Sequence, residues 1–278
     1  MESGLRHVTV RLGRGNIDEL TTSRDNRVAP GKAGGNGSPA RATLIEARNL
    51  PRHVGIIMDG NGRWAAARGQ GRSEGHRAGS RTVRQIVRLA RRIGLEALTL
   101  YAFSFQNWAR PATEVAGLMA LLHDFLIDER REILDNGIRL AAVGDLAQLP
   151  PEVRAVLDQL CADSADNARM TLTLALSYGG QEEIAQAMRT LAVQVAEGKL
   201  EPEAIDVNTI RSHIPSLKVG EPDLIIRTGG ERRLSNFLLF GSAYAELYFS
   251  DRYWPGALQE SQVHGLQLTA PSGQAQAD

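Results

Sequence analysis

The stretch that decides the fold is His53-Val-Gly-Ile-Ile-Met-Asp-Gly-Asn-Gly-Arg-Trp64. Its apolar residues Val54–Met58 predict a buried strand, which leads directly into Asp59. Gly60 and Gly62 then permit tight backbone geometry at a point where a helix can begin. The stretch therefore predicts a strand, a glycine turn and a helix in succession.

The same alternation continues along the chain. Helical spacing of apolar residues runs from Val83 to Ile93, where Gly94 ends it; a second helix follows Pro111 and ends near Gly137, and Pro151 opens a third. Further short apolar runs suited to buried parallel strands are Ala97–Phe103, Ile138–Val143, Thr171–Ser177, Leu224–Ile226 and Leu247–Phe249. The pattern predicts the α/β class: a single open, mostly parallel six-stranded sheet flanked by helices, with its ligand site at the carboxyl ends of the strands.

Composition defines the domain boundaries. The chain has 278 residues, of which 42% are hydrophobic, enough for a sizeable core. Residues 1–40 are predicted to be a flexible N-terminal extension, because Thr21–Ala40 turns to Gly, Pro, Ser and Asn; a short strand at Val8–Leu12 is the alternative. One folded domain is predicted over residues 41–264, followed by a flexible tail over 265–278.

Charge and cysteine content exclude several classes of protein. The 32 basic and 32 acidic residues give a net charge of zero, so nothing global favours nucleic acid or an anionic membrane as a partner. The single cysteine, Cys161, excludes an intramolecular disulfide and a zinc site with several thiolates. No apolar run approaches the roughly 18–20 residues of a membrane span. A cytoplasmic enzyme is expected.

The first candidate site is the glycine turn itself. Its backbone N–H groups, aided by a helix dipole, suit a phosphate, and Asp59 suits Mg²⁺, which prefers a carboxylate or two with waters and phosphate oxygens. An ordinary turn with an Asp cap is the alternative. Between Arg63 and Arg92 there are nine arginines against one acidic residue, Glu74, which favours a local anion site with Arg72 and His76. For Arg84, Arg88, Arg91 and Arg92 a solvated helix face is preferred.

Nucleotide cofactors and nucleic acid are disfavoured. The segment Gly69–Gly75 imitates a dinucleotide fingerprint, but its spacing is one residue too long and no strand directly precedes it. The glycine turn ends in Arg63, without the Gly-Lys-Ser/Thr ending of a nucleotide P-loop. The arginine-rich segment has little aromatic interleaving, which argues against a nucleic-acid surface.

Two more strands open into polar segments. Ser104, Gln106, Asn107 and Arg110 follow the second strand, with plain loop chemistry as the alternative. In Asp223–Asn236 a further strand leads into glycines with Arg227, Arg232, Arg233 and Ser235, a second candidate anion site; surface ion pairs with Glu231 are the alternative. Two basic strand ends and one metal-competent Asp suggest two phosphorylated substrates that are joined or exchanged.

These motifs together resemble a known family. The segments His53–Trp64, Gly75–Gly79, Tyr101–Pro111, Ser177–Gly180 and Asp223–Pro255 resemble the cis-prenyltransferases, or isoprenyl transferases, of the undecaprenyl diphosphate synthase type. The similarity spans about Leu50–Pro255. It implies the cis-prenyltransferase fold and the repeated addition of isopentenyl diphosphate to an allylic diphosphate such as farnesyl diphosphate, with new Z double bonds.

The resemblance also implies roles for individual residues. Asp59 is the implied Mg²⁺ ligand, Glu246 a second metal position, and Asn107 stands where a proton acceptor is usually described; because an amide is a feeble base, we expect Asn107 to orient substrate or water instead. The implied substrate-contact residues are Gly60, Asn61, Gly62, Arg63, Trp64, Arg72 and His76 for the allylic diphosphate, Ser104, Phe105, Gln106, Trp108 and Arg110 in the second motif, and Arg227, Arg233, Leu234 and Ser235 for isopentenyl diphosphate.

The resemblance further implies Mg²⁺ as cofactor, a homodimer, no nucleic-acid partner, and at most peripheral contact with the inner face of the membrane. Undecaprenyl diphosphate, a carrier for bacterial wall synthesis, is the product that the family favours. The sequence departs from the family at Gln106, Ser177, Gln181 and Gly256, where Glu, Asn, Arg and Asp are usual. A non-catalytic partner subunit and a nucleotide-dependent α/β enzyme are the alternatives.

Overall fold

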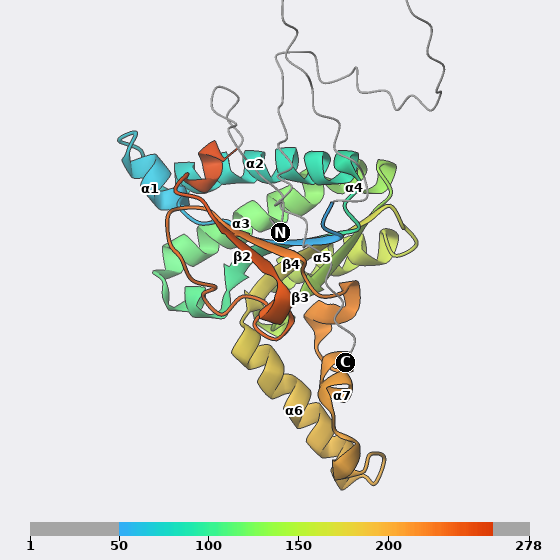
Figure 1. The fold of residues 1–278 in the computed structure, drawn as a ribbon. Coiled ribbons are helices and arrows are strands. Elements are labelled where there is room, and N and C mark those ends of the chain that lie inside the picture. Colours follow the sequence, from blue (N-terminus) through green and yellow to red (C-terminus); the bar gives the residue numbers. More distant parts are fainter. Residues whose placement is uncertain (1–49, 258–278) are drawn as a thin grey trace, which may run out of the picture.

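A computed structural model describes residues 50–257 of the chain. Its six strands are β1 (His53–Ile57), β2 (Ala97–Ser104), β3 (Ile138–Val143), β4 (Met170–Tyr178), β5 (Leu224–Arg227) and β6 (Glu246–Phe249). They form one sheet in the order β3-β4-β2-β1-β5-β6, and every neighbouring pair is parallel (Figure 1). The predicted α/β sheet is confirmed. The predicted extension, tail, strand at Val8–Leu12 and outer domain boundaries lie outside the described residues.

The central strand β1 is buried on both faces. All five of its residues are buried, and its side chains alternate between two cores because successive residues of a strand point to opposite faces. Ile56 belongs to the larger core, which the helices α2–α5 share, whereas Ile57 packs with Phe237 on the other face. A helical layer thus covers one face, and the loop that carries Phe237 covers part of the other.

The helices are α1 (Asn61–Ala66), α2 (Arg72–Ile93), α3 (Ala112–Asp128), α4 (Arg130–Asp135), α5 (Pro151–Asp163), α6 (Gly180–Ala196) and α7 (Val207–Ser212). Gly94 ends α2 with a φ of 89°, as predicted. The prediction of a single helix from Pro111 to near Gly137 is wrong, because the segment forms the two helices α3 and α4. It divides at Glu129, where ψ is −3° and departs from the helical value of about −42°. No Pro or Gly marks this break in the sequence.

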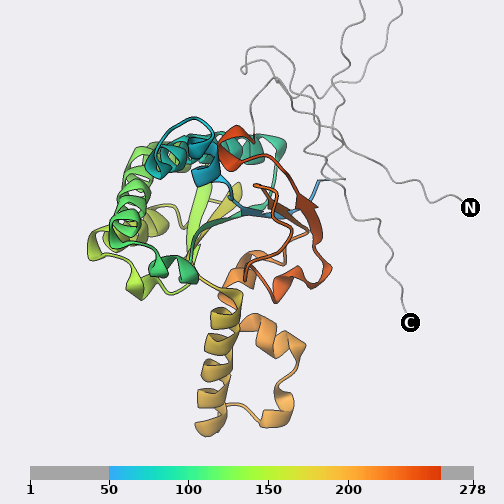
Figure 2. The ribbon, with the colours of Figure 1, turned by 90° about the vertical axis from the view of Figure 1, so that its left-hand side faces the viewer.

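An arm formed by α6 and α7 projects from the sheet (Figures 1 and 2). Ala187, Ile214 and Leu217 form its small core. Glu183 fixes its base, because the carboxylate accepts hydrogen bonds from the Tyr178 hydroxyl (2.6 Å) and from the backbone N–H of Ser216 (2.8 Å). Among residues 50–257, no helix is long and apolar enough to cross a membrane.

The strand order determines where a ligand site forms. The chain lays β2, β3 and β4 on one side of β1 and then crosses to place β5 on the other side. Ligands of open α/β sheets bind at the carboxyl ends of strands beside such a switch in direction. The carboxyl ends of β1, β2 and β5 meet there, and each carries one of the polar segments predicted from the sequence.

Candidate active site

The turn after β1 is fixed from several sides. Gly60 has a φ of 100°, and a Cβ on it would lie 2.7 Å from Cδ1 of Tyr253, so no other residue fits there. The Asp59 carbonyl accepts hydrogen bonds from the Thr228 hydroxyl (2.7 Å) and from the Trp254 N–H (3.0 Å). These contacts hold the Asp59 side chain at the carboxyl edge of the sheet.

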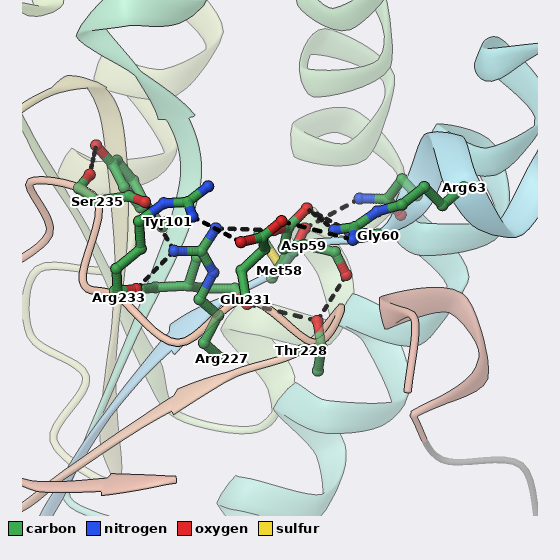
Figure 3. A network of polar contacts seen from close by, with 12 residues as sticks. Met58, Asp59, Gly60, Arg63, Tyr101, Arg227, Thr228, Glu231, Arg233 and Ser235 are labelled. Carbon is green, nitrogen blue, oxygen red and sulfur yellow. Dashed lines mark hydrogen bonds and ion pairs between the residues drawn. The ribbon is translucent and has the colours of Figure 1, made fainter. Parts of the chain in front are cut away.

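Two guanidinium groups bracket the Asp59 carboxylate (Figure 3). Arg227 Nη2 lies 2.9 Å from Oδ2 and Arg63 Nη2 lies 3.1 Å from Oδ1, which also accepts from the Gly60 N–H at 2.6 Å. Burial raises the pKa of the Asp59 carboxyl, but the hydrogen bond from Arg227 and the charge of Arg63 outweigh it, and the pKa lies below its usual value. Asp59 is therefore ionised at neutral pH.

Arg227 connects the ends of β1 and β5. Its side chain is only 5% exposed, and its Nη1 donates to Ser235 Oγ (2.7 Å) and to the Arg233 carbonyl (2.6 Å). Ser235 adopts a left-handed φ of 48°, uncommon for a residue other than glycine. The unusual backbone conformation of Ser235 therefore occurs at the residue whose hydroxyl binds Arg227. Strained backbone of this kind is concentrated at functional sites.

Close helix packing brings the start of α2 to the same place. A Cβ on Gly75 would lie 2.1 Å from the Asn61 carbonyl oxygen, and one on Gly79 would lie 2.2 Å from Asn61 Oδ1. Only glycine at both positions lets α2 approach α1 this closely. The approach places Arg72 and His76 in the cavity wall beside Asp59.

Glu114 is a site residue that sequence reasoning missed. Its carboxylate accepts from Arg72 Nη1 and from Arg110 Nη1, each at 3.0 Å, and so joins α2 to the start of α3. Burial, followed by the charge of Arg110, lowers the pKa of His76, which is therefore neutral at pH 7. The sequence signal for Glu114 was its position four residues after Arg110 at the start of a helix, the spacing of an ion pair.

The second motif forms a 3₁₀ helix, Phe105–Ala109, directly after β2. Asn107 Oδ1 accepts from the Ser104 N–H at 3.2 Å, so the amide oxygen is engaged within the turn. Trp108 donates from Nε1 to Ser177 Oγ at 2.8 Å and packs edge-on against Phe103. Asn107 is part of the cavity wall, whereas Trp108 anchors the motif.

A cavity of about 450 Å³ collects most of the predicted residues. Its polar end is lined by Asp59, Gly60, Asn61, Gly62, Arg63, Arg72, His76, Ser104, Asn107, Arg110, Arg227 and Ser235. Its apolar part includes Val83 from α2, Leu100 and Leu174 from the sheet, and Leu118, Leu121, Leu122 and Phe125 from α3. Three polar atoms of lining residues, Asn61 Oδ1, His76 Nε2 and Arg227 Nε, are buried without a hydrogen-bond partner in the described chain. Such atoms leave hydrogen-bonding capacity that the chain itself does not use.

The other predicted contact residues, Trp64, Phe105, Gln106, Trp108, Arg233 and Leu234, are not in the cavity wall. Arg233 pairs with Glu231 at 2.6 Å, the ion pair that was the alternative in the sequence, while its carbonyl binds Arg227. Leu234 packs against the core around Phe237. Arg233 and Leu234 therefore support the loop around Arg227 rather than line the cavity.

Glu246 lies away from Asp59 within this chain. It begins β6, pairs in register with Leu224, and thus stands level with Val54 at the amino ends of the strands. Asp59 is five residues further along, about 16 Å at 3.3 Å per residue. The structure therefore does not bring the two predicted metal positions together in one chain.

The helix after the glycine turn contributes less than the sequence suggested. α1 has only six residues, and the Gly60 N–H donates to Asp59 itself. A short helix sums few peptide dipoles, so the positive potential at this turn comes from guanidinium groups rather than from a helix terminus.

The donor set fits Mg²⁺ that is shared with a substrate. Within residues 50–257 no group of three or more His, Cys, Asp or Glu side chains is arranged to hold a metal. Asp59 offers one partly exposed carboxylate in the cavity wall, 30% accessible. Mg²⁺ is commonly bound through one or two carboxylates together with substrate phosphates and waters, rather than in an all-protein cage.

Two departures from the family pattern have visible consequences. Trp64 Nε1 is buried without a partner among the described residues, and a Cβ on Gly256 would lie 3.8 Å from it. An Asp at position 256 would bring an acceptor to this N–H, which Gly256 does not. Ser177 adopts a φ of 47°, a conformation in which Asn is enriched.

Fold and site together define an α/β protein whose cavity joins a charged, arginine-lined mouth to an apolar interior. A protein-family model described as "Putative undecaprenyl diphosphate synthase" matches residues 57–267. An isoprenyl transferase of Zymomonas mobilis is 50% identical over 206 residues, 74% of this chain and 83% of the relative. One of Chlorobaculum tepidum is 46% identical over 213 residues, 77% and 80% of the two chains.

Solved structures agree with these relatives. Lavandulyl diphosphate synthase from Lavandula x intermedia, in complex with dimethylallyl diphosphate, superposes with a TM-score of 0.73 at 37% identity over 75% of this chain and 90% of the other. A probable undecaprenyl diphosphate synthase from Campylobacter jejuni gives 0.62 at 30% identity, over 76% and 90%. The chain belongs to the undecaprenyl diphosphate synthase family and is a prenyl transferase. The resemblance inferred from the motifs is confirmed.

Proposed function

We propose that the protein catalyses the Mg²⁺-dependent, sequential cis-condensation of isopentenyl diphosphate onto an allylic diphosphate, with farnesyl diphosphate as the starter. The product would be a Z-polyprenyl diphosphate, undecaprenyl diphosphate, which serves as a lipid carrier for the cell wall. The observation that carries the proposal is the Asp59 carboxylate, set between Arg63 and Arg227 at the mouth of an apolar cavity.

The charged mouth suits a diphosphate. Arg63, Arg72, Arg110 and Arg227 line it, and each guanidinium can donate paired hydrogen bonds to phosphate oxygens. The related lavandulyl diphosphate synthase is described in complex with dimethylallyl diphosphate, an allylic diphosphate. Ionisation of an allylic C–O bond leaves negative charge on the diphosphate, which these donors would stabilise at about 1.5–3 kcal/mol per charged hydrogen bond.

Asp59 would hold Mg²⁺ together with diphosphate oxygens, and the ion, when bound, would act as a Lewis acid on the leaving group. Arg63 and Arg227 both contact the Asp59 carboxylate, so they are placed to bind a diphosphate that is held next to it. Glu246 remains a proposed second metal position. Because it stands at the other edge of the sheet, a partner chain of the proposed homodimer would have to supply it.

Asn107 would orient the substrate rather than accept a proton. An amide is a feeble base, and its oxygen already accepts from the Ser104 N–H. Its amide N–H₂ group remains to bind a phosphate or a water, and a diphosphate oxygen would take the proton that isopentenyl diphosphate loses. Ser104 and Arg110 line the cavity beside it and complete the second motif's share of the site.

The apolar part of the cavity would receive the growing chain. Leu118, Leu122 and Phe125 line it from α3, and each buried methylene contributes about 0.8 kcal/mol. Each added isoprene unit would move from water into this apolar part, and the gain in free energy from its burial would favour continued elongation. We propose a cytoplasmic protein with at most peripheral membrane contact at the inner face, since its product is a lipid.

The test is diphosphate release from farnesyl and isopentenyl diphosphates, with chromatography of the extended lipid. We expect release that stops with a chelator and returns with Mg²⁺, together with Z-polyprenyl products. The proposal is overturned if this substrate pair gives no release, or if turnover instead requires ATP or NAD, as the alternative nucleotide-dependent enzyme would.

A further inference from the structure

Five charged residues join α2 to the junction of α3 and α4, and we call them the ion-pair ladder: Arg84, Arg88, Asp128, Glu129 and Glu132. Arg84 Nη2 lies 3.0 Å from Asp128 Oδ2, and Arg84 also pairs with Glu129. Arg88 binds both carboxylate oxygens of Glu132. These arginines lie on the helix face predicted to be solvated, and Arg88 is 55% exposed. Opposite them, however, lie acidic residues more than 40 positions away in the chain.

The ladder begins where the cavity ends. α2 and α3 both start at the charged mouth, and their last residues in the cavity wall are Val83 and Phe125. Arg84 is the next residue of α2, and Asp128 lies three residues beyond Phe125. Figure 1 shows α3 alongside α2, with α4 at the far end of α2. The ladder thus connects the two walls at the inner end of the apolar cavity.

Glu129 links the ladder to the shape of the wall. It is 8% exposed and occupies the break between α3 and α4. A buried carboxylate that loses its partner is costly, so the pair with Arg84 favours this bent arrangement of the helices over a separated one. The Arg91 Nε–H, which donates to the Asn136 carbonyl at 3.0 Å, adds a further link at the end of α4.

The size of the cavity limits how long a product chain it can hold while α2 and α3 stay in place. A volume of about 450 Å³ lies within the range of sites for drug-sized ligands, roughly 300–1,000 Å³. Every round of condensation lengthens the chain by one isoprene unit, so a long product needs more space than a starter. One wall is the sheet, which is continuous, so the space grows most readily by parting α2 from α3. The ladder opposes that motion.

We propose that the ion-pair ladder determines product length, by limiting how far the inner ends of α2 and α3 separate before the chain is released. This inference rests on the proposed chain elongation. The residues are specificity determinants that act through the helices, since they lie outside the cavity wall.

The test reverses one pair of the ladder in the full-length protein. Arg88 and Glu132 are 55% and 26% exposed, so we expect the variants to fold. The single variants Arg88→Glu and Glu132→Arg place like charges opposite each other. We expect their main product to be at least one isoprene unit longer than that of the unaltered enzyme. The double variant Arg88→Glu/Glu132→Arg restores the pair and is expected to restore the original length.

The matched control is Arg154→Gln, which removes an ion pair with Asp158 (2.7 Å) that lies within α5 and does not connect helices. It is expected to leave product length unchanged. General loss of stability would reduce the amount of product but not its length, so the readout separates the two effects. If product length is unchanged in both single variants, the ladder proposal is overturned. Absence of any extended lipid from the unaltered enzyme overturns the proposed function and the ladder with it.

Discussion

The two ends of β1 carry polar residues with opposite fates. At the amino end His53 is 2% exposed, and its ring nitrogens bind the Gly220 carbonyl (2.9 Å) and the Thr99 hydroxyl (2.8 Å). At the carboxyl end the Asp59 carboxylate is partly exposed, and unpaired polar atoms such as Arg227 Nε lie in the same cavity wall.

The difference distinguishes structural from functional polar groups. A buried polar group whose partners are all within the protein stabilises the fold and has little left to offer a ligand. A charged group among unsatisfied donors retains interactions for a ligand, at some cost in stability. We therefore expect substitutions at the His53 end to change stability and substitutions at the Asp59 end to change turnover.

The largest effect is expected for Asp59→Asn. The substitution keeps the shape of the side chain but removes the charge that would hold Mg²⁺ and order the two guanidinium groups. We expect kcat/KM for diphosphate release to fall by roughly a thousandfold, with a circular dichroism spectrum like that of the unaltered protein. A folded variant with full activity would contradict the assignment of Asp59, and an unfolded one would contradict the proposed division between the two ends of β1.

An intermediate effect is expected for His53→Gln, on stability. Burial lowers the pKa of His53 below its usual value of 6.5, so the unfolded chain binds a proton that the folded chain does not. The free energy of unfolding should therefore be highest above pH 6.5 and decrease as the pH falls below it. His53→Gln should lower stability at pH 7 by about 1–3 kcal/mol and weaken this pH dependence, leaving the part due to His76.

Urea unfolding at several pH values measures this prediction, with kcat recorded in parallel. A variant that keeps the full pH dependence would contradict its assignment to His53. A variant that loses kcat rather than stability would show that the amino end of β1 is not purely structural.

The smallest effect is expected at Tyr253, whose ring lies 5.4 Å from the Arg63 guanidinium. Such cation–π contacts contribute about 0.5–1 kcal/mol at exposed sites. Tyr253→Leu should therefore raise the KM for the allylic diphosphate a few-fold with little change in kcat, whereas Tyr253→Phe retains the ring and should behave like the unaltered enzyme. Equal behaviour of the two variants would argue against a positioning role for the ring.

Much of the fold could be predicted because its signals are local. All six strands were found within one or two residues, since each is a short apolar run. The glycines at 60, 75 and 79 stand in the sequence motifs, and the structure supplies the reason, which is a left-handed φ or the close approach of α1 and α2. The helix break at Glu129 could not be predicted from local signals, because no Pro or Gly marks it and Glu129 meets Arg84 of another helix there.

The candidate site was only partly predictable. Twelve of the predicted residues line one cavity, since segments that follow parallel strands gather at one edge of the sheet. Glu114 escaped notice because it joins Arg72, 42 positions away, to Arg110. Trp108 and Leu234 lie in contact motifs but pack inward.

The amino-acid sequence by itself determined the α/β class, the Asp59 turn and the family, because strand runs, glycine turns and motif spacing are properties of neighbouring residues. Only the tertiary structure decided which charges meet. Strand order places Arg227 on Asp59 across 168 positions and leaves Glu246 at the opposite edge, and helix packing brings Arg84 and Arg88 of a solvent-facing helix surface against distant acidic residues. The physical reason is that charge pairing depends on distance in space, which linear spacing does not encode.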